Sequence, residues 1–327
     1  MTSFHTRFDK PQSTRRVMAW GIPDKLEFTP KQVLRYFDGH IVIGVDGELQ
    51  KIDLDGNLVG QPKKPFPTPI KSAAIIDNML IATWLDQELL LARMAAIDLN
   101  NEFHQGVNRG DLRVRKTIDK SIHPQGNTWS HVLDAEPLSL TANSNSFTFV
   151  LWRKGIYNLS VDAIENWRAP EPRWKKLAKI PRAMETVGTT CDEQYFEVWS
   201  KGGGIIRFDI QSGKTIDSKI IPLDGYLEGV FKHDEHYLLQ LNNSIIAIYE
   251  AGEIKLTAKL SGPINYAEWS EVDQGWHIAG WRELAIISAK TMSRTQLSEI
   301  AVHIDSKSGI YLCNDGTWDI IDAQEEE

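Results

Sequence analysis

The stretch Cys191-Asp192-Glu193-Gln194-Tyr195-Phe196-Glu197-Val198-Trp199-Ser200-Lys201-Gly202 carries the pattern that decides the fold. An acidic turn at 191–193 precedes an aromatic and β-branched run, and a polar turn at 200–202 ends that run. A second apolar run, 205–210, follows. Short runs of this composition between turn residues are typical of β-strands. We therefore expect two short strands here, over 195–199 and 205–210.

The same pattern occurs seven times along the chain. The first turn begins in successive units at Phe37, Ile76, Ala142, Cys191, His233, Val272 and Ile304. The second turn begins at Val45, Leu85, Arg153, Ser200, Asn242, Arg282 and Asn314. A period of about 40 residues built from short strands is typical of a β-propeller. The sequence therefore predicts an all-β fold, a seven-bladed β-propeller whose strands follow one another outward from the axis of the ring.

The ends of the repeat predict how the ring closes. The last unit ends at Ile321 with three strands, and a single strand-like run, 16–20, precedes the first unit. We expect this N-terminal strand to complete the last blade, because closure removes exposed sheet edges. The predicted domains are a flexible arm at 1–14, a single propeller at 15–323 and an acidic tail at 324–327.

Two segments interrupt the rhythm. Within 100–135 we predict an outer strand at 112–116, followed by a long loop that carries Trp129. The second segment, 162–172, is also predicted to be a loop. Loops of this length in a compact domain are usually functional or disordered. The loop around Trp129 is therefore a candidate docking surface.

Composition limits the class of protein. The 327 residues carry a net charge of −8 and a pI near 5.7, which argues against a nucleic-acid binder, because such a protein needs a basic face. No run approaches the ~18 apolar residues of a membrane span, and the first residues lack the apolar core of a signal peptide. Two cysteines, Cys191 and Cys313, fall in units far apart in the ring, which favours free thiols. We expect a cytoplasmic protein that does not bind membranes.

A carboxylate recurs near the start of the innermost strand. Counting back from the first turn leads to Glu136, Glu185, Glu228, Glu268 and Glu299, with Lys71 in the second unit and about Gln32 in the first. Carboxylates at one level would ring a mouth of the central channel and attract a cation or a peptide with Lys or Arg. Alternatively, each glutamate caps backbone amides of its own loop, or pairs with Lys71 or Arg182.

Tryptophan recurs at the end of the second strand, as Trp84, Trp152, Trp199 and Trp281. These rings either pack between blades or form an exposed platform. The turns after these positions differ in charge: they carry Asp315, Asp46, Glu48, Asp86 and Glu88 on one side of the ring, and Arg153, Lys154, Lys201 and Arg282 on the other. We predict a bipolar face, with ordinary solvated turns as the alternative.

No motif indicates catalysis, a cofactor or a metal. His104, His123 and His131 lie near one another without metal-ligand spacing. The run Gly202-Gly203-Gly204 lacks the Lys-Ser/Thr of a phosphate loop, and no serine lies in a nucleophile elbow. We therefore predict no catalytic residues, no cofactor and no metal.

Over most of its length the chain resembles the seven-bladed WD40-like and quinoprotein-like propellers, in rhythm more than in residues. The dipeptides Gly39-His40 and Trp318-Asp319 do not occupy the places they have in WD40 repeats. The resemblance implies a propeller that acts as a rigid platform for other proteins.

Our leading hypothesis is a non-catalytic scaffold, a monomeric propeller within a complex, that binds protein partners through the face with the second turns. The predicted partner-binding residues are Glu136, Glu185, Glu228, Glu268, Glu299, Lys71, Arg153, Lys154, Arg282 and Trp129. The alternative is an enzyme or a binder of a small cationic ligand that uses the ring of glutamates.

Overall fold

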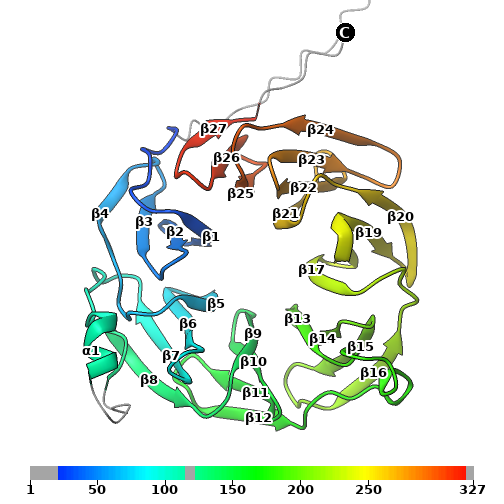
Figure 1. Cartoon of the computed structure of the whole chain (residues 1–327), viewed down its shortest axis with the longest axis horizontal. Helices are drawn as coiled ribbons and strands as arrows, with labels where there is room; N and C mark the ends of the chain where they lie inside the picture. The colour runs from blue at the N-terminus through cyan, green and yellow to red at the C-terminus, as the bar shows by residue number, and fades with distance from the viewer. Residues whose placement is uncertain (1–20, 115–121, 322–327) are drawn as a thin grey trace, which may run out of the picture.

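The computed structural model describes residues 21–114 and 122–321, whose strands form seven antiparallel sheets around a central channel (Figure 1). Six sheets have four strands, and the last has three within the described residues. We number them as blades 1 to 7 in chain order. Consecutive blades are neighbours in the ring, and the last lies beside the first. The chain is therefore an all-β, seven-bladed β-propeller, which confirms the fold that the repeat predicts.

The two inner strands of each blade form the wall of the channel and the centre of the sheet. The innermost strands are β1 (Pro30–Tyr36), β5 (Ile70–Ile76), β9 (Pro137–Ala142), β13 (Thr186–Cys191), β17 (Leu227–His233), β21 (Ile264–Ser270) and β25 (Ala301–Asp305). The second strands are β2 (Gly39–Gly44), β6 (Met79–Asp86), β10 (Ser146–Leu151), β14 (Tyr195–Ser200), β18 (His236–Leu241), β22 (Gly275–Gly280) and β26 (Ile310–Cys313).

The outer strands complete the sheets. The third strands are β3 (Leu49–Asp53), β7 (Leu91–Asp98), β11 (Gly155–Ser160), β15 (Gly204–Asp209), β19 (Ile245–Glu250), β23 (Glu283–Ile287) and β27 (Trp318–Ile320). The fourth strands of blades 1 to 6 are β4 (Leu58–Lys63), β8 (Asn127–Leu133), β12 (Glu165–Ala169), β16 (Thr215–Ile220), β20 (Glu253–Lys259) and β24 (Met292–Gln296). Short helical turns are α1 (Arg109–Val114), η1 (Lys175–Leu177) and η2 (Asn242–Ser244).

Every innermost strand begins with the same backbone contact. The amide that follows the last ladder pair of the second strand donates to the carbonyl before the innermost strand, as from Val45 to Thr29 at 3.0 Å. The ladder between these strands then shifts by one residue in each blade, which is a β-bulge. These features define equivalent positions in the seven blades. We call the side on which the innermost strands begin the upper face and the side on which they end the lower face.

Burial explains why the sequence pattern is easy to recognise. The second strands β2 and β10 are buried along their whole length, whereas the outer strand β16 is mostly exposed. A central strand is covered on both faces by neighbouring blades, so its residues are apolar without alternation. One apolar cluster joins Trp199 of blade 4 to Leu227 and Tyr237 of blade 5. The core of the protein therefore lies between the blades.

The two interrupted segments were predicted wrongly. Of the outer strand expected at 112–116, the described part, 112–114, belongs to α1, and the fourth strand of blade 2 is β8 instead. The helix begins where Asp111 accepts a hydrogen bond from the amide of Asn108, a reciprocal cap. In blade 3, the loop expected at 162–172 contains the fourth strand, β12. Both outer strands are partly polar, so their composition does not distinguish them from loops.

The predicted closing strand, 16–20, lies outside the described residues, as do 1–14 and 324–327. The segment that follows it is described. Its amide at Leu26 donates to the carbonyl of Gly316 in blade 7 at 3.0 Å, and Lys25 pairs with Asp315 at 3.0 Å. Leu26 also packs in an apolar cluster with residues of blades 7 and 1. The N-terminal segment therefore enters the ring at the junction of its last and first blades.

Candidate interaction surfaces and a pocket between three blades

The register contradicts the predicted ring of five carboxylates. Glu136 and Glu185 lie one residue before their innermost strands, and Glu299 lies two before. Glu228 is the second residue of β17, whereas Glu268 is the fifth residue of β21. At ~3.3 Å per residue, Glu268 lies about 16 Å further along its strand than Glu136. The five side chains are therefore not at one level.

The counting failed because the first turns start at unequal distances from the strands. Cys191 is the last residue of β13, whereas Val272 lies two residues beyond β21. The strands also differ by one residue in length. A fixed distance from the turn therefore leads to different positions in different blades. The same spread applies to the other two members of the predicted ring, since Lys71 is the second residue of β5 and Gln32 the third of β1.

Two of the five glutamates are held in local ion pairs, as the alternative interpretation predicts. Glu136 lies 3.7 Å from Lys71. Glu185 lies 2.8 Å from Arg182 and 3.1 Å from Lys201, and the hydrogen bond from Arg182 lowers the pKa of Glu185. Glu228 is exposed and Glu299 half-buried. These four residues lie near the upper face, and only Glu268 lies deep along its strand.

The four tryptophans occupy three different positions, and their exposure divides them into two pairs. Trp84 and Trp199 lie in the ladder and are 0% and 1% exposed. Trp152 and Trp281 lie one residue beyond the ladder and are 50% and 47% exposed. Packing between blades is therefore the role of the first pair. The second pair projects from the upper face.

The acidic turns of the upper face are paired with cations from flanking segments. Lys64 lies 2.9 Å from Glu48 and 3.8 Å from Asp46. Arg109 of α1 lies 2.9 Å from Asp86 and 3.0 Å from Glu88. Asp315 pairs with Lys25, as described above. These contacts reduce the negative potential that the turn sequences alone predict for this side.

The basic turns are paired unequally. Lys154 lies 2.7 Å from Asp134, and Lys201 pairs with Glu185. Arg153 lies with its guanidinium 4.4 Å from the centre of the Trp152 ring, a cation–π contact. Arg282 follows Trp281 in the same way, and both arginines have a left-handed backbone, with φ of 57° and 56°. Blades 3 and 6 thus each present an exposed Trp-Arg pair on the upper face.

Trp129 is a packing residue in β8 and does not lie in a loop. Its indole Nε1 donates to the carbonyl of Val161 at 2.7 Å, and its ring stacks on Phe147 at 5.8 Å. Phe147 in turn stacks on Phe149. The docking surface predicted around Trp129 is therefore contradicted, because this side chain fixes blade 2 against blade 3.

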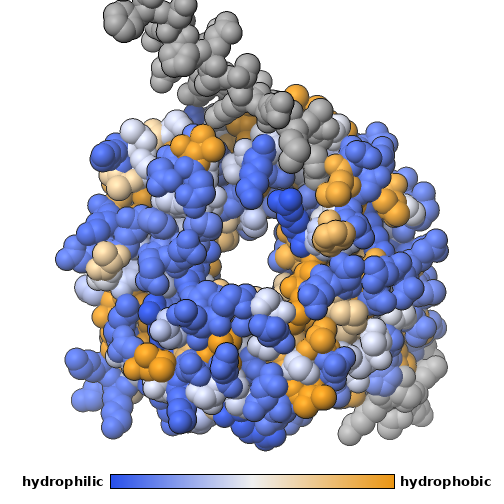
Figure 2. Space-filling view, turned by 180° about the vertical axis from the view of Figure 1, so that it is seen from behind, coloured by the Kyte–Doolittle hydropathy of each residue, from blue (hydrophilic) through white to orange (hydrophobic). Residues whose placement is uncertain are grey.

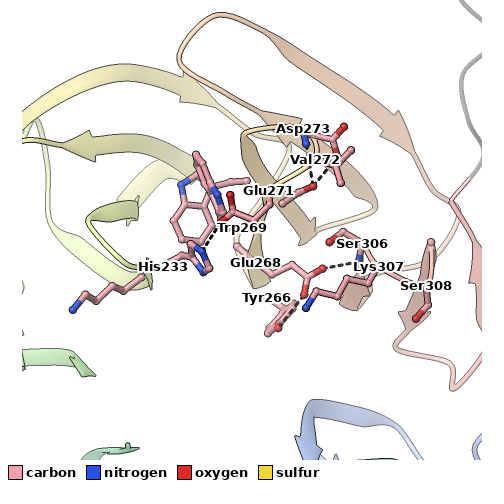
Figure 3. A pocket seen from close by; sticks show the side chains of 15 residues that line it. His233, Tyr266, Glu268, Trp269, Glu271, Val272, Asp273, Ser306, Lys307 and Ser308 are labelled. Atoms are coloured by element: carbon pink, nitrogen blue, oxygen red, sulfur yellow. Dashed lines mark hydrogen bonds and ion pairs between the residues drawn. The ribbon is translucent and has the colours of Figure 1, made fainter. Parts of the chain in front are cut away.

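A pocket of about 680 Å³ lies at the lower face, where blades 5, 6 and 7 meet. Its lining consists of 266–273 and Trp276 of blade 6, Lys232 and His233 of blade 5, and 306–309 of blade 7. Figure 3 shows Tyr266 and Glu268 beside the turn that carries Ser306 and Lys307, and His233, Trp269 and Glu271 together on the other side. Of the predicted site residues, only Glu268 lines this pocket.

The electrostatics of the pocket centre on Glu268. Its Oε1 accepts a hydrogen bond from the amide of Ser306 at 2.5 Å, and Tyr266 donates to its Oε2 at 3.5 Å. Burial raises the pKa of Glu268, and the hydrogen bond from Ser306 acts against this rise. Burial also raises the pKa of Tyr266, and the negative charge of Glu268 adds to that effect. This carboxylate is therefore held in a partly desolvated place.

No sequence pattern indicates the remaining pocket residues. Trp269 stacks on His236 with ring centres 4.1 Å apart, and His233 bonds to Glu271 at 2.9 Å. His233, Trp269 and Glu271 belong to innermost strands and first turns of two blades. In the sequence they resemble ordinary strand and turn residues. Their proximity depends on how the blades are placed around the ring.

The structure holds few other candidates. Within 21–114 and 122–321, no group of three or more His, Cys, Asp or Glu is placed to hold a metal ion. In the same ranges, no helix has the length and apolar character needed to cross a membrane. Both cysteines are free, with Cys191 half-buried and Cys313 buried.

Comparisons with known proteins support the fold alone. No family model matches the chain, and no curated protein sequence matches it. The β-propeller domain of Cps50 (Swd1) from Myceliophteria thermophila is similar in structure, with a TM-score of 0.64 and 12% identity over 90% of this chain and 97% of that one.

Two further solved structures are also similar. The WD40 β-propeller domain of Doa1 has a TM-score of 0.56 and 13% identity, over 91% of this chain and 94% of that one. BamB from Moraxella catarrhalis has a TM-score of 0.54 and 11% identity, over 93% of this chain and 97% of that one. These similarities, at 13% identity or less, agree with the β-propeller fold and show nothing beyond it.

Proposed function

We propose that this protein is a non-catalytic scaffold that binds protein partners through its upper face, with Trp152–Arg153 and Trp281–Arg282 as anchors. The observation that carries the proposal is the exposure of two indoles, 50% and 47%, each followed by an arginine in a left-handed turn. Tryptophan and arginine are the residues that most often dominate the binding energy of protein interfaces. A large exposed ring also gains more from burial by a partner than a charged turn does.

The surroundings of the anchors support this choice of face. Val45, at the position equivalent to Trp152 in blade 1, is also exposed, and Leu90 in the second turn of blade 2 is 88% exposed. The charged residues around them are already paired locally, so they would contribute mainly to orientation. A polar rim around a few apolar anchors is typical of non-obligate interfaces.

Two further parts of the proposal rest on weaker support. The free thiols Cys191 and Cys313 agree with a reducing compartment, so we propose the cytoplasm. The likeness to WD40 propeller domains agrees with a role in protein interaction. We propose that a single copy of the propeller takes part in a larger complex.

The test compares affinity capture from native extract for three forms of the full chain. They are the parent, the double variant Trp152→Ala/Trp281→Ala, and the control Phe37→Ala/Leu54→Ala, which removes exposed apolar groups of the lower face. We expect a partner to be lost from the first variant and kept by the control, and the purified partner to bind the parent directly. Identical partner profiles for the parent and the tryptophan variant would contradict the proposal.

A further inference from the structure

The pocket at the lower face has a chemistry of its own, separate from the upper face. It lies about a full strand length away from the Trp-Arg pairs, because the innermost strand β21 runs from one face to the other. Figure 2 shows the molecule from behind the view of Figure 1, with the channel open and most of the surface around it polar. A cavity with mixed polar and aromatic lining beside such a channel is accessible to a small group or a side chain.

Most of the charged residues that line the pocket already have a polar or charged partner. Glu271 is paired with His233 at 2.9 Å, and Asp273 bonds to His277 at 2.7 Å. Lys232 is turned away, since its ammonium lies 2.5 Å from Asp192 and its side chain is 5% exposed. These contacts leave Glu268 and Lys307 as the charged groups of the lining without an ion pair to another described residue.

Glu268 retains the capacity to accept further hydrogen bonds. A carboxylate offers about four acceptor sites, and the donors to this one are Ser306 and, at 3.5 Å, the hydroxyl of Tyr266. Neither donor carries a charge. The partly desolvated carboxylate therefore lacks the counter-charge that would compensate for its burial.

Aromatic and apolar groups flank this carboxylate. Tyr266 lies two residues before Glu268, on the same face of β21, and is half-buried. Trp269 points to the opposite face, toward blade 5, and Val272 is 83% exposed at the rim. A planar guanidinium can bond to a carboxylate while its face lies on an aromatic ring, and its aliphatic stem can cover an apolar rim. An anion would instead meet the carboxylate at close range.

We propose that the pocket between blades 5, 6 and 7 binds a guanidinium or alkylammonium group, with Glu268 as its anionic partner and Tyr266 as the aromatic wall beside it. Lys307 lies in the first turn of blade 7, where Asp305 fixes the backbone by accepting from the amides of Lys307 and Ser308. Its ammonium competes with the ligand for the same carboxylate. The ligand is either a free cation or an arginine or lysine side chain of a partner.

The test is a calorimetric titration of the full chain with agmatine, with N-acetyl-arginine-methylamide, and with the neutral analogue N-acetyl-citrulline-methylamide. We expect the cationic probes to bind and the citrulline probe not to bind. Glu268→Gln should weaken binding about tenfold or more, as for the loss of a charged hydrogen bond. The control Glu228→Gln, an exposed glutamate outside the pocket, should leave binding unchanged. Lys307→Gln should strengthen it.

The outcomes separate the possible sources and the possible failures. Equal affinity for agmatine and for a Gly-Gly-Arg-Gly-Gly peptide indicates a free cation, whereas tighter binding of the peptide indicates a side chain of a partner. Equal binding of the citrulline probe, equal effects of the two Glu→Gln variants, or no heat at millimolar probe would each overturn the proposal. The variant Trp152→Ala/Trp281→Ala should bind the probes as the parent does. A negative result for the pocket would therefore leave the scaffold proposal unaffected, and the reverse also holds.

Discussion

The carboxylate of Glu268 in blade 6 accepts a hydrogen bond from the backbone amide of Ser306 in blade 7, with Oε1 2.5 Å from the amide nitrogen. This contact ties the innermost strand of one blade to the first turn of the next. It also places an acidic side chain in a partly desolvated cavity, where burial raises its pKa. The carboxyl of Glu268 is therefore protonated at a higher pH in the folded protein than in the unfolded chain. Above the raised pKa, the ionised carboxylate lowers the free energy of unfolding.

The variant Glu268→Gln should therefore be at least as stable as the parent at pH 8. Its carbonyl still accepts from Ser306, and the cost of a buried charge is removed. The gain should vanish below about pH 4, where the carboxyl is neutral in both folded and unfolded protein. Melting temperatures at the two pH values check this. A clear loss of stability at pH 8, with Glu228→Gln unchanged, would show instead that the negative charge stabilises the contact.

The sequence predicted the repeat well because it records the burial of single strands. The runs 195–199 and 205–210 match β14 and β15 to within one residue. By contrast, Trp129 was assigned to a loop because its outer strand is mixed in polarity. The pocket could not be predicted for another reason. His233, Trp269 and Ser306 line it together because three blades are placed side by side, and no single repeat encodes that placement.

The four tryptophans should differ sharply in their effect on stability. Trp84→Ala should lower the free energy of unfolding by about 3–5 kcal/mol, because it leaves a large cavity in the core. Trp281→Ala should change it by less than about 0.5 kcal/mol, since half of that ring is already in solvent. Urea unfolding of both variants measures the difference. Similar losses for the two would mean that Trp281 is buried in solution.

A second pH dependence should come from His303, which is 6% exposed and whose Nδ1 has no hydrogen-bond partner among the described residues. Burial lowers its pKa from 6.5 to about 3, with Asp305 acting against this shift and His40 adding to it. Below about pH 6.5 the imidazole of His303 is protonated in the unfolded chain but stays neutral in the folded protein. The free energy of unfolding therefore decreases as the pH falls through this range. At a pH below both pKa values of His303, this shift lowers the free energy of unfolding by about 5 kcal/mol.

The variant His303→Gln should reduce the dependence of stability on pH. Glutamine is chosen because Gln32 occupies the equivalent register position in blade 1. Melting temperatures at pH 7.5 and about pH 4.5 should differ less for the variant than for the parent. His131→Gln, at an exposed site of β8, serves as the control. Parallel curves for the parent and His303→Gln would mean that this imidazole is protonated in the folded protein.

Ring closure can be tested by two deletions. Removing 1–22 takes away the predicted closing strand and should leave the outer edge of β27 unpaired, which favours aggregation and lowers the melting temperature. Removing 1–14 alone deletes only the predicted arm and should have little effect. Light scattering and thermal unfolding distinguish the two. A form without 1–22 that is as soluble and stable as the parent would contradict closure by this segment.

The most costly single charge change should occur between blades 4 and 5. Glu197, whose side chain is 2% exposed, lies 2.8 Å from Arg207. It also accepts a hydrogen bond from Thr190 at 2.9 Å, and Tyr237 lies 3.1 Å from its Oε2. Arg207→Met removes the only cation of this network among the described residues and leaves a buried carboxylate uncompensated, which typically costs about 3–5 kcal/mol.

The double variant Glu197→Gln/Arg207→Met should recover most of that loss, because a neutral amide can still accept from Thr190 and Tyr237. Urea unfolding of the two single variants and the double variant forms a thermodynamic cycle that isolates the coupling between the two charges. We expect the double variant to be more stable than Arg207→Met alone. Losses that simply add would show that the two charges are not coupled and that the pair does not act as a unit.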